Sequence, residues 1–192
     1  MIRLPQEDFC QAKGISPLNK YQRDGGLGIA DCMKILDGAI NPDYDKQVFF
    51  ITQVVFWLLF STDGHSKNFS LRHLKYNQYE MTPLYDVLSI HPLIGRKNTQ
   101  IPLQKAKMAM AVRGSSNYYL IQRIQRKHFI KQAVVTGIAK DDAERLIEEV
   151  IDNAESVVER VRAQIPDNFP KSLANKILDG MLKQVTKLSN AS

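Results

Sequence analysis

The feature that most constrains the fold is a run of apolar residues at 48–60. On a helix from about Asp45 to Phe60 its apolar side chains cover almost the full circumference, and a helix that is apolar all round lies inside a domain. Thr52 and Gln53 interrupt the run, which is also shorter than the roughly 18–20 apolar residues that a membrane-spanning helix requires. The sequence therefore predicts one buried core helix, with Asp43 as its N-cap, and no membrane association.

A polar loop, STDGHSKN at residues 61–68, follows the core helix directly. Residues 69–74 then alternate between two faces, and residues 79–82 can return as a partner strand around Tyr76 and Asn77. The chain comes back toward the loop at Asp86, after this hairpin. We therefore expect one short β-hairpin immediately after the most buried helix.

Three oxygen-bearing side chains in this region have the spacing of a phosphoryl-transfer site. Asp63 and Asn68 repeat the Asp-x₄-Asn spacing of the protein-kinase catalytic loop, and Asp86 arrives after a hairpin as a metal-binding aspartate of kinases does. Phosphoryl transfer needs a carboxylate that accepts the proton of the attacking hydroxyl, and hard oxygen ligands for Mg²⁺. Asp63 suits the first role, and Asn68 and Asp86 suit the second. Gly64 would let the loop turn sharply, and Lys67 would offer a cation to phosphate oxygens.

Simpler interpretations of the same residues stay open. Asp63 is compatible with capping a turn, and Asp86 with being one more loop aspartate. His65 is compatible with a hydrogen-bonding loop residue, or with a transition-metal hydrolase site that it shares with Asp63. No third histidine is placed to complete that site, because the others lie on unrelated predicted elements, at His73, His91 and His128.

The rest of the chain predicts a single, mainly α-helical domain over residues 1–192. Residues 1–27 are expected to be irregular, and residues 83–118 to be mostly loop with an apolar patch at 108–112. Asp141 with Glu144 resembles a capping box at the start of a long amphipathic helix. The helices expected outside the core run over residues 29–36, 117–126, 127–135 (stopped by Gly137), about 141–163 and 171–188.

Composition is that of an ordinary globular protein, with 44% hydrophobic and 24% charged residues. Only Cys10 and Cys32 are present and no apolar signal segment opens the chain, so the sequence predicts a reducing compartment, the cytoplasm. The net charge of +6 includes a loose basic cluster between Arg113 and Lys131. This cluster is compatible with a solvated basic face, or with contact with nucleic acid or an acidic partner.

Two longer strings carry a specific family resemblance. TDGHSKNFS at residues 62–70, followed by MTPLYDVLS at residues 81–89, resembles the signature of HipA-type serine/threonine kinases, the toxins of bacterial toxin–antitoxin pairs. RLPQEDFCQA and YQRDGGLGIA, further upstream, are similar to the segment that enters the C-terminal lobe of that family. Histidine two residues after the aspartate is also similar to the catalytic loop of phosphoinositide-kinase-like enzymes. The resemblance implies the helical C-terminal lobe of a protein-kinase-like fold.

The resemblance also implies a role for each residue of the motif. Asp63 would be the catalytic base acting on a serine or threonine hydroxyl, and Asn68 and Asp86 would bind the Mg²⁺ of ATP. His65 and Lys67 would support the catalytic loop. A HipB-like antitoxin, which is a DNA-binding repressor, is implied as a partner, and a translation-related protein such as an aminoacyl-tRNA synthetase as the substrate.

Two departures from the family pattern shape the expected function. Family members carry an ATP-cradling N-terminal lobe, with a serine whose autophosphorylation silences the enzyme. We expect no such lobe here, because the glycine-rich run at 25–28 follows no predicted strand and is typical of a turn. The chain is therefore expected to be truncated, or to be half of a split kinase with a separately encoded N-lobe. A catalytically inactive module that binds an antitoxin or a substrate is the alternative. Few basic residues follow the pair at 128–129, which argues against the direct DNA contact that family members make there.

Overall fold

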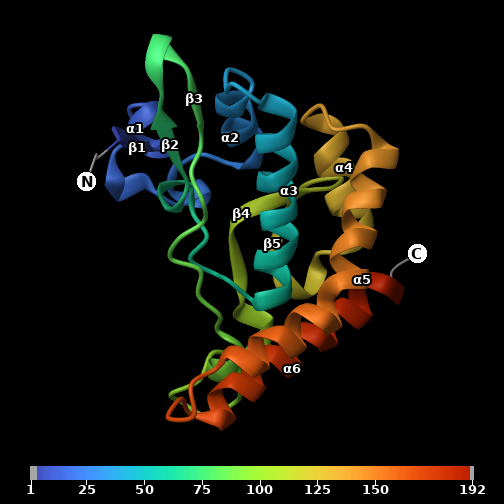
Figure 1. Ribbon diagram of the computed structural model, residues 1–192. Coiled ribbons are helices and arrows are strands. Elements are labelled where there is room, and N and C mark those ends of the chain that lie inside the picture. The colour runs from blue at the N-terminus through green and yellow to red at the C-terminus, as the bar shows by residue number, and fades with distance from the viewer. Residues whose placement is uncertain (1–3, 191–192) are drawn as a thin grey trace.

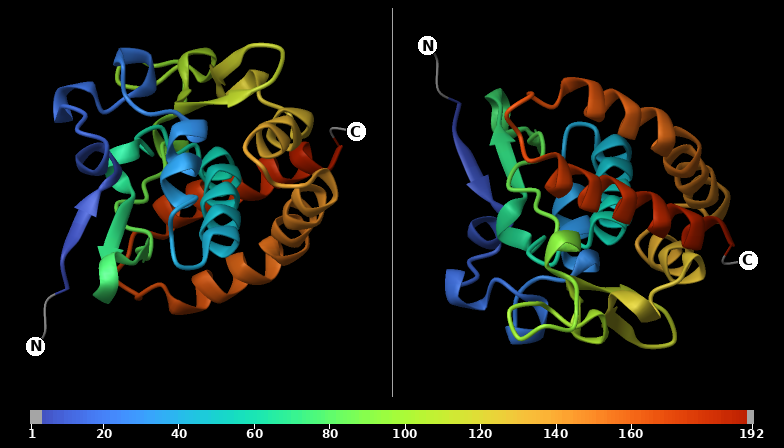
Figure 2. Two further views of the ribbon diagram at one scale, coloured as in Figure 1. Left: turned by 90° about the horizontal axis from the view of Figure 1, so that it is seen from above. Right: turned by 90° about the horizontal axis from the view of Figure 1, so that it is seen from below.

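The computed structural model describes residues 4–190, and one long helix, α3 (Pro42–Leu59), lies at the centre of the fold (Figure 1). Helices α2 (Ile29–Leu36), α5 (Lys140–Gln164) and α6 (Lys171–Asn190) contact α3, and the views along the vertical axis show it enclosed (Figure 2). Phe49 is fully buried, so the prediction of a buried core helix is confirmed. Among residues 4–190, no helix is long and apolar enough to cross a membrane.

The ends of α3 explain how the chain enters the polar loop. Asn41 is the N-cap residue, so the prediction of Asp43 in that position is wrong. Pro42 starts the helix, where its missing N–H needs no partner. Asp43 lies in the first turn instead, where its negative charge favours the positive end of the helix dipole. Phe60 ends the helix in a left-handed conformation (φ +53°) and directs the chain into the loop.

The predicted hairpin after the core helix is present, and a third strand joins it. β2 (Ser70–His73) pairs with β3 (Tyr79–Met81) on one edge and with β1 (Gln6–Asp8) on the other, all antiparallel. Tyr76 and Asn77 both have positive φ at the connection, in accord with the predicted turn. The expectation of an irregular N-terminal segment is wrong for β1, because three residues are too few for a periodic pattern to show.

A second hairpin, β4 (Lys107–Arg113) with β5 (Asn117–Leu120), stands where the sequence predicted a loop and the start of a short helix. Residues 108–112 are buried on both faces of β4, so they show no alternation from which a strand could be recognised. Two glutamines from other segments accept hydrogen bonds from its backbone. Gln22 Oε1 accepts from the Ala111 N–H (2.7 Å), and Gln132 Oε1 accepts from the Arg113 N–H (2.9 Å). Contacts with distant segments therefore provide hydrogen-bond partners for the backbone of a strand that the local sequence pattern does not indicate.

The C-terminal helices follow the predictions except at one helix start. α4 (Arg126–Val135) ends before Gly137, whose φ of +91° confirms the predicted stop. Ala139 is the N-cap of α5 and makes no side-chain cap, so the predicted capping box of Asp141 and Glu144 is wrong. The remaining short elements are α1 (Phe9–Ala12) and 3-10 turns at Pro17–Asn19, Gln22–Asp24, Ser66–Asn68, Lys75–Asn77, His91–Leu93, Leu103–Lys105 and Ile121–Arg123.

A cluster of four phenylalanines connects α1, α3 and the end of the polar loop. The Phe69 ring lies 4.7 Å from the Phe49 ring, and 5.8 Å from both the Phe9 and the Phe56 rings, measured between centroids. All four side chains are at most 2% exposed. Aromatic pairs at these distances contribute about 0.5–1.5 kcal/mol beyond the burial of their area. The residue that follows Asn68 is therefore anchored in the core, and the loop is attached to α3 at both of its ends.

Candidate active site

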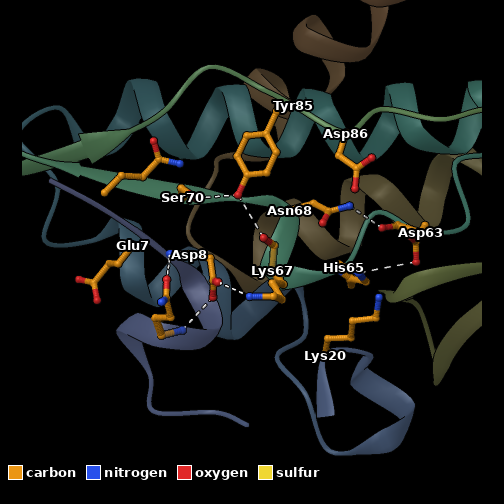
Figure 3. A pocket seen from close by; sticks show the side chains of 12 residues that line it. Glu7, Asp8, Lys20, Asp63, His65, Lys67, Asn68, Ser70, Tyr85 and Asp86 are labelled. Atoms are coloured by element: carbon orange, nitrogen blue, oxygen red, sulfur yellow. Dashed lines mark hydrogen bonds and ion pairs between the residues drawn. The ribbon is translucent and has the colours of Figure 1, made fainter. Parts of the chain in front are cut away.

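A surface cleft of about 530 Å³ lies where the polar loop meets β1 and the segment after β3 (Figure 3). Glu7 and Asp8 from β1, Lys20 from the N-terminal segment and Tyr85 from the segment after β3 contribute to its walls. All the site residues that the sequence predicted line this cleft: Asp63, His65, Lys67, Asn68 and Asp86. The fold thus brings together side chains that the sequence places before and after the hairpin.

The backbone of the loop fixes Asp63 and Asn68 relative to each other. The side-chain amide nitrogen of Asn68 donates to the carbonyl oxygen of Asp63 (2.8 Å), which leaves the amide oxygen available for a cation. Gly64 lies against the ring of Phe56, and a Cβ placed on it would be 2.3 Å from two ring carbons. Gly64 does not have a positive φ, so glycine is needed for space rather than for the sharp turn that the sequence suggested.

The carboxylate of Asp63 accepts a hydrogen bond from the hydroxyl of Tyr21. This hydrogen bond, followed by burial and by the negative charge of Asp63, raises the pKa of Tyr21 to about 12. The Asp63 side chain is 36% exposed, so a second hydroxyl can approach it from solvent. Tyr21 carries no local signal of this contact in the sequence, although it lies in one of the two upstream strings that carry the family resemblance.

His65 is almost completely buried beside Asp63, with 3% of its surface exposed. Its Nε2 lies 3.6 Å from Asp63 Oδ1, and its ring meets the Tyr21 ring edge-on at 5.2 Å. Neither ring nitrogen has a hydrogen-bond partner among residues 4–190. Burial is the main cause that lowers the pKa of His65, and the positive charge of Lys20 lowers it further. The neutral form of the imidazole is therefore favoured at this buried position beside Asp63.

Lys67 is held by an ion pair with Asp8, with its Nζ atom 2.8 Å from Asp8 Oδ2. Asp8 also caps α1 through its other carboxylate oxygen, which accepts from the Gln11 N–H. The Tyr85 hydroxyl lies 2.6 Å from Ser70 Oγ and donates to the Lys67 carbonyl (3.1 Å). These contacts tie β1, the loop and the segment after β3 to one another. Asp8, like Tyr21, was missed from the sequence although it lies in an upstream string.

Asp86 lies at the rim of the cleft, and its carboxylate points toward the side that holds Asn68 and Asp63 (Figure 3). Its backbone is left-handed (φ +54°), which is uncommon outside glycine but tolerated by aspartate. Its carboxylate forms no hydrogen bond or ion pair with any residue of the described part of the chain. One amide oxygen and one carboxylate fit Mg²⁺, which is usually bound by one or two carboxylates together with substrate phosphates and water.

The other histidines lie outside the cleft. His73 Nε2 is 2.7 Å from Glu7 Oε1, His91 Nε2 is 2.8 Å from the Leu58 carbonyl, and the His128 ring stacks on Tyr118. Between residues 4 and 190, no group of three or more His, Cys, Asp or Glu side chains is placed to hold a metal ion. Within the described residues, the transition-metal interpretation of Asp63 and His65 therefore lacks a third ligand.

Known proteins share the sequence pattern and the fold of this chain. Residues 2–158 match the sequence model of the HipA-like C-terminal domain. A Sinorhizobium fredii protein named "Putative kinase Y4mE" is 29% identical over 168 residues, which are 87% of this chain and 37% of that protein. The HipA chain in a Shewanella oneidensis complex of HipA, HipB and operator DNA superposes with a TM-score of 0.78 at 20% identity, over 98% of this chain and 44% of that chain.

Both relatives are more than twice as long as the part of them that this chain matches. The structural similarity confirms the predicted fold class, a mainly helical C-terminal lobe of the kinase-like HipA fold. The family match extends over the loop, the hairpin and the segment with Asp86, so it includes the whole candidate site. The chain is therefore a member of the family defined by the HipA-like C-terminal domain.

Proposed function

We propose that this chain, residues 1–192, is the C-terminal catalytic lobe of a HipA-like serine/threonine protein kinase that transfers phosphate from Mg-ATP to a protein hydroxyl. The observation that carries the proposal is the meeting of Asp63, Asn68 and Asp86 in one cleft. An unpaired carboxylate, a fixed amide and a partly exposed carboxylate are the groups that phosphoryl transfer requires. Their positions on one short loop and one anchored segment favour the preorganisation on which this chemistry depends.

Each residue has a distinct part in the proposed reaction. Asp63 orients the acceptor hydroxyl and accepts its proton. Asn68 and Asp86 would hold the Mg²⁺, and Mg-ATP supplies the phosphoryl group and the positive charge that neutralises it. His65 and Lys67 support the loop, since His65 is buried beneath Asp63 and Lys67 is paired with Asp8. Lys67 lines the cleft but is held by Asp8, so it is proposed to act through the position of the loop.

The partners belong to the same proposal. A HipB-like antitoxin is the proposed binding partner, because the Shewanella HipA is complexed with HipB. A translation-related protein, such as an aminoacyl-tRNA synthetase, is the proposed substrate, and the cytoplasm is the proposed location. The chain spans less than half the length of these relatives, and an N-terminal lobe is proposed to complete the ATP site.

A second candidate is an inactive module that binds an antitoxin or a substrate. The observation that favours it is the hydrogen bond from Tyr21 to Asp63, which occupies the proposed base. Both candidates lead us to expect little turnover from this chain alone. Losing one donor that stabilises developing charge costs on the order of 10²–10³ in rate, and residues 1–192 tested by themselves would act without the several such groups of an N-terminal lobe.

The test is transfer of labelled phosphate from ATP to a protein substrate in the presence of Mg²⁺. Wild type, Asp63→Ala and the control Asp152→Ala, an exposed aspartate on α5, are compared with and without an added polypeptide that provides the N-terminal lobe of a HipA-like kinase. The proposed kinase function predicts activity only with that lobe, abolished by Asp63→Ala and retained by Asp152→Ala. Strong activity of the chain alone would show that the lobe is self-sufficient. No activity under any condition, or equal activity of both variants, favours the binding module.

A further inference from the structure

A second, smaller hollow of about 260 Å³ lies on the other side of the contact between Tyr21 and Asp63. It is lined by Tyr21 and Thr62 and by residues from the segment between Ile90 and Ala109. It shares no lining residue with the nucleotide cleft, yet the Tyr21 hydroxyl bonds to the Asp63 carboxylate that lines that cleft. Asp63 is therefore placed between two hollows.

The rim of this second hollow is positively charged. Arg23, Lys105 and Lys107 line it, and none of its described lining residues is acidic. Both lysines are exposed and form no ion pair with any residue between 4 and 190. Arg23 has only an exposed neighbour, Asp24, at 3.6 Å, and its guanidinium lies 5.4 Å from the centre of the Tyr21 ring. These three cations are available to an anionic partner.

The floor of the hollow is apolar, formed by Ile90, Ile101 and Met108 among others. An apolar floor with a localised basic rim fits a polypeptide segment that presents an apolar side chain and carboxylates. A nucleic-acid strand would require cations along a track, and flat aromatic faces on which its bases stack. The only aromatic ring that lines the hollow, within the described residues, is Tyr21, and cations flank it.

In phosphoryl transfer the acceptor oxygen attacks roughly in line with the leaving group, so it approaches from the side opposite the nucleotide. Asn68 and Asp86 line the first cleft together with Asp63, whereas neither of them lines the second hollow, so the second hollow is the candidate for the acceptor side. Tyr21 donates its hydroxyl to Asp63 in the way that an acceptor serine would. We propose that this hollow binds the acceptor segment of the substrate, and that it selects a serine or threonine flanked by acidic residues. This inference rests on the proposed kinase function and adds the substrate class.

The test measures binding, so it does not require turnover. Two fluorescein-labelled peptides share a central serine and an apolar neighbour, and differ only in carrying aspartates or lysines as flanking residues. Their affinity for the full chain is measured by fluorescence anisotropy at about 0.1 M salt, where the Debye length is about 10 Å. The variant Lys105→Glu/Lys107→Glu is compared with Lys34→Glu/Lys75→Glu, which makes the same change in net charge at two exposed lysines outside the hollow. Circular dichroism and thermal unfolding establish that both variants are folded.

We expect the acidic peptide to bind wild type more tightly than the basic one. The Lys105→Glu/Lys107→Glu variant should weaken it by about tenfold or more, whereas the control should stay within about twofold, because charge pairs act over a Debye length of about 10 Å. Equal binding of the two peptides, equal loss in both variants, or displacement of the acidic peptide by a short RNA at lower concentration than by unlabelled peptide would overturn the proposal. The proposed kinase function is tested separately, because phosphate transfer that depends on Asp63 can persist without acidic preference, and acidic preference without transfer.

Discussion

The Tyr21 hydroxyl donates a hydrogen bond to the Asp63 carboxylate, and this bond joins the N-terminal segment to the polar loop. It provides the carboxylate with a partner in the absence of an acceptor hydroxyl. It also separates the cleft that holds Asn68 and Asp86 from the basic hollow beneath Lys105 and Lys107. A substrate hydroxyl that reaches Asp63 would have to replace or share this hydrogen bond.

The ionisation of Tyr21 reports this contact directly. We expect the pKa of Tyr21, raised to about 12 in the wild type, to fall toward its ordinary value of 10.0 in Asp63→Ala, because the hydrogen bond and the negative charge are both removed. Titration of ring-labelled tyrosines by ¹³C NMR measures it, with Tyr21→Phe assigning the resonance and Asp152→Ala as control. A Tyr21 resonance that titrates alike in wild type and Asp63→Ala would contradict the contact.

Gly64 and Phe56 form a steric pair that positions the loop. We expect Gly64→Ala to lower the free energy of unfolding by about 1–3 kcal/mol, as overpacked substitutions do, because the new methyl group would overlap the Phe56 ring. Chemical denaturation measures the change. The control is Gly14→Ala, since nothing lies within 4 Å of a Cβ there, although its φ of +63° makes that substitution strained for a different reason.

A double-mutant cycle distinguishes steric overlap with Phe56 from backbone strain as the cause of the lost stability. Phe56→Leu should remove much of the cost of Gly64→Ala, because the smaller side chain leaves space for the methyl group. The same substitution should leave the cost of Gly14→Ala unchanged. Strict additivity of Gly64→Ala and Phe56→Leu would show that the steric pair does not determine the choice of glycine.

Asp86 is expected to provide most of the Mg²⁺ dependence of nucleotide binding. Asp86→Asn removes the charge but keeps a residue type that tolerates a left-handed backbone, so stability should change little. We expect the Mg²⁺-dependent affinity for an ATP analogue, measured by calorimetry, to fall by at least about tenfold, while Mg²⁺-free binding stays unchanged. Asp152→Asn is the control, and an unchanged Mg²⁺ dependence in Asp86→Asn would remove this residue from the metal site.

Stability should fall in mild acid. Burial lowers the pKa of His91 below its ordinary value of 6.5, and Lys187 and Lys183 lower it further, against the hydrogen bond to the Leu58 carbonyl. The folded state therefore keeps His91 neutral, while the unfolded chain takes up a proton as the pH falls through 6.5. The stability that this neutral state contributes is fully present above that pH and is lost progressively below it. Burial lowers the pKa values of His65 and His128 too, in the same direction.

The variant His91→Leu tests this assignment. It should be less stable at neutral pH by about 1–3 kcal/mol, since the buried Leu58 carbonyl loses its donor. Its unfolding free energy, measured by denaturant titration between pH 5 and pH 8, should depend less steeply on pH below 6.5 than that of the wild type. Parallel pH profiles would show that His91 does not contribute to the acid sensitivity.

The sequence by itself determined the elements whose patterns are local. The apolar circumference of α3, the alternation that leads into β2 and β3, and the spacing of Asp63 and Asn68 all lie within short segments. The spacing within the loop could therefore be recognised before the fold was known. The predicted α2 has the bounds that the structure gives, Ile29–Leu36, because an amphipathic period of this length depends on one buried face.

Only the tertiary structure decided which distant residues complete the site. Tyr21 is hydrogen-bonded to Asp63, and Asp8 is paired with Lys67. β1 adds a third strand to the hairpin. The partners in each contact are far apart in the sequence, so no periodic pattern of residues indicates that they meet. β4 was missed because both of its faces are buried against other segments, so it shows no alternation, and two of its backbone N–H groups find partners only in Gln22 and Gln132. A local pattern records which face of a segment is buried, but hydrogen bonds between segments depend on how the whole chain packs, and no single segment encodes them.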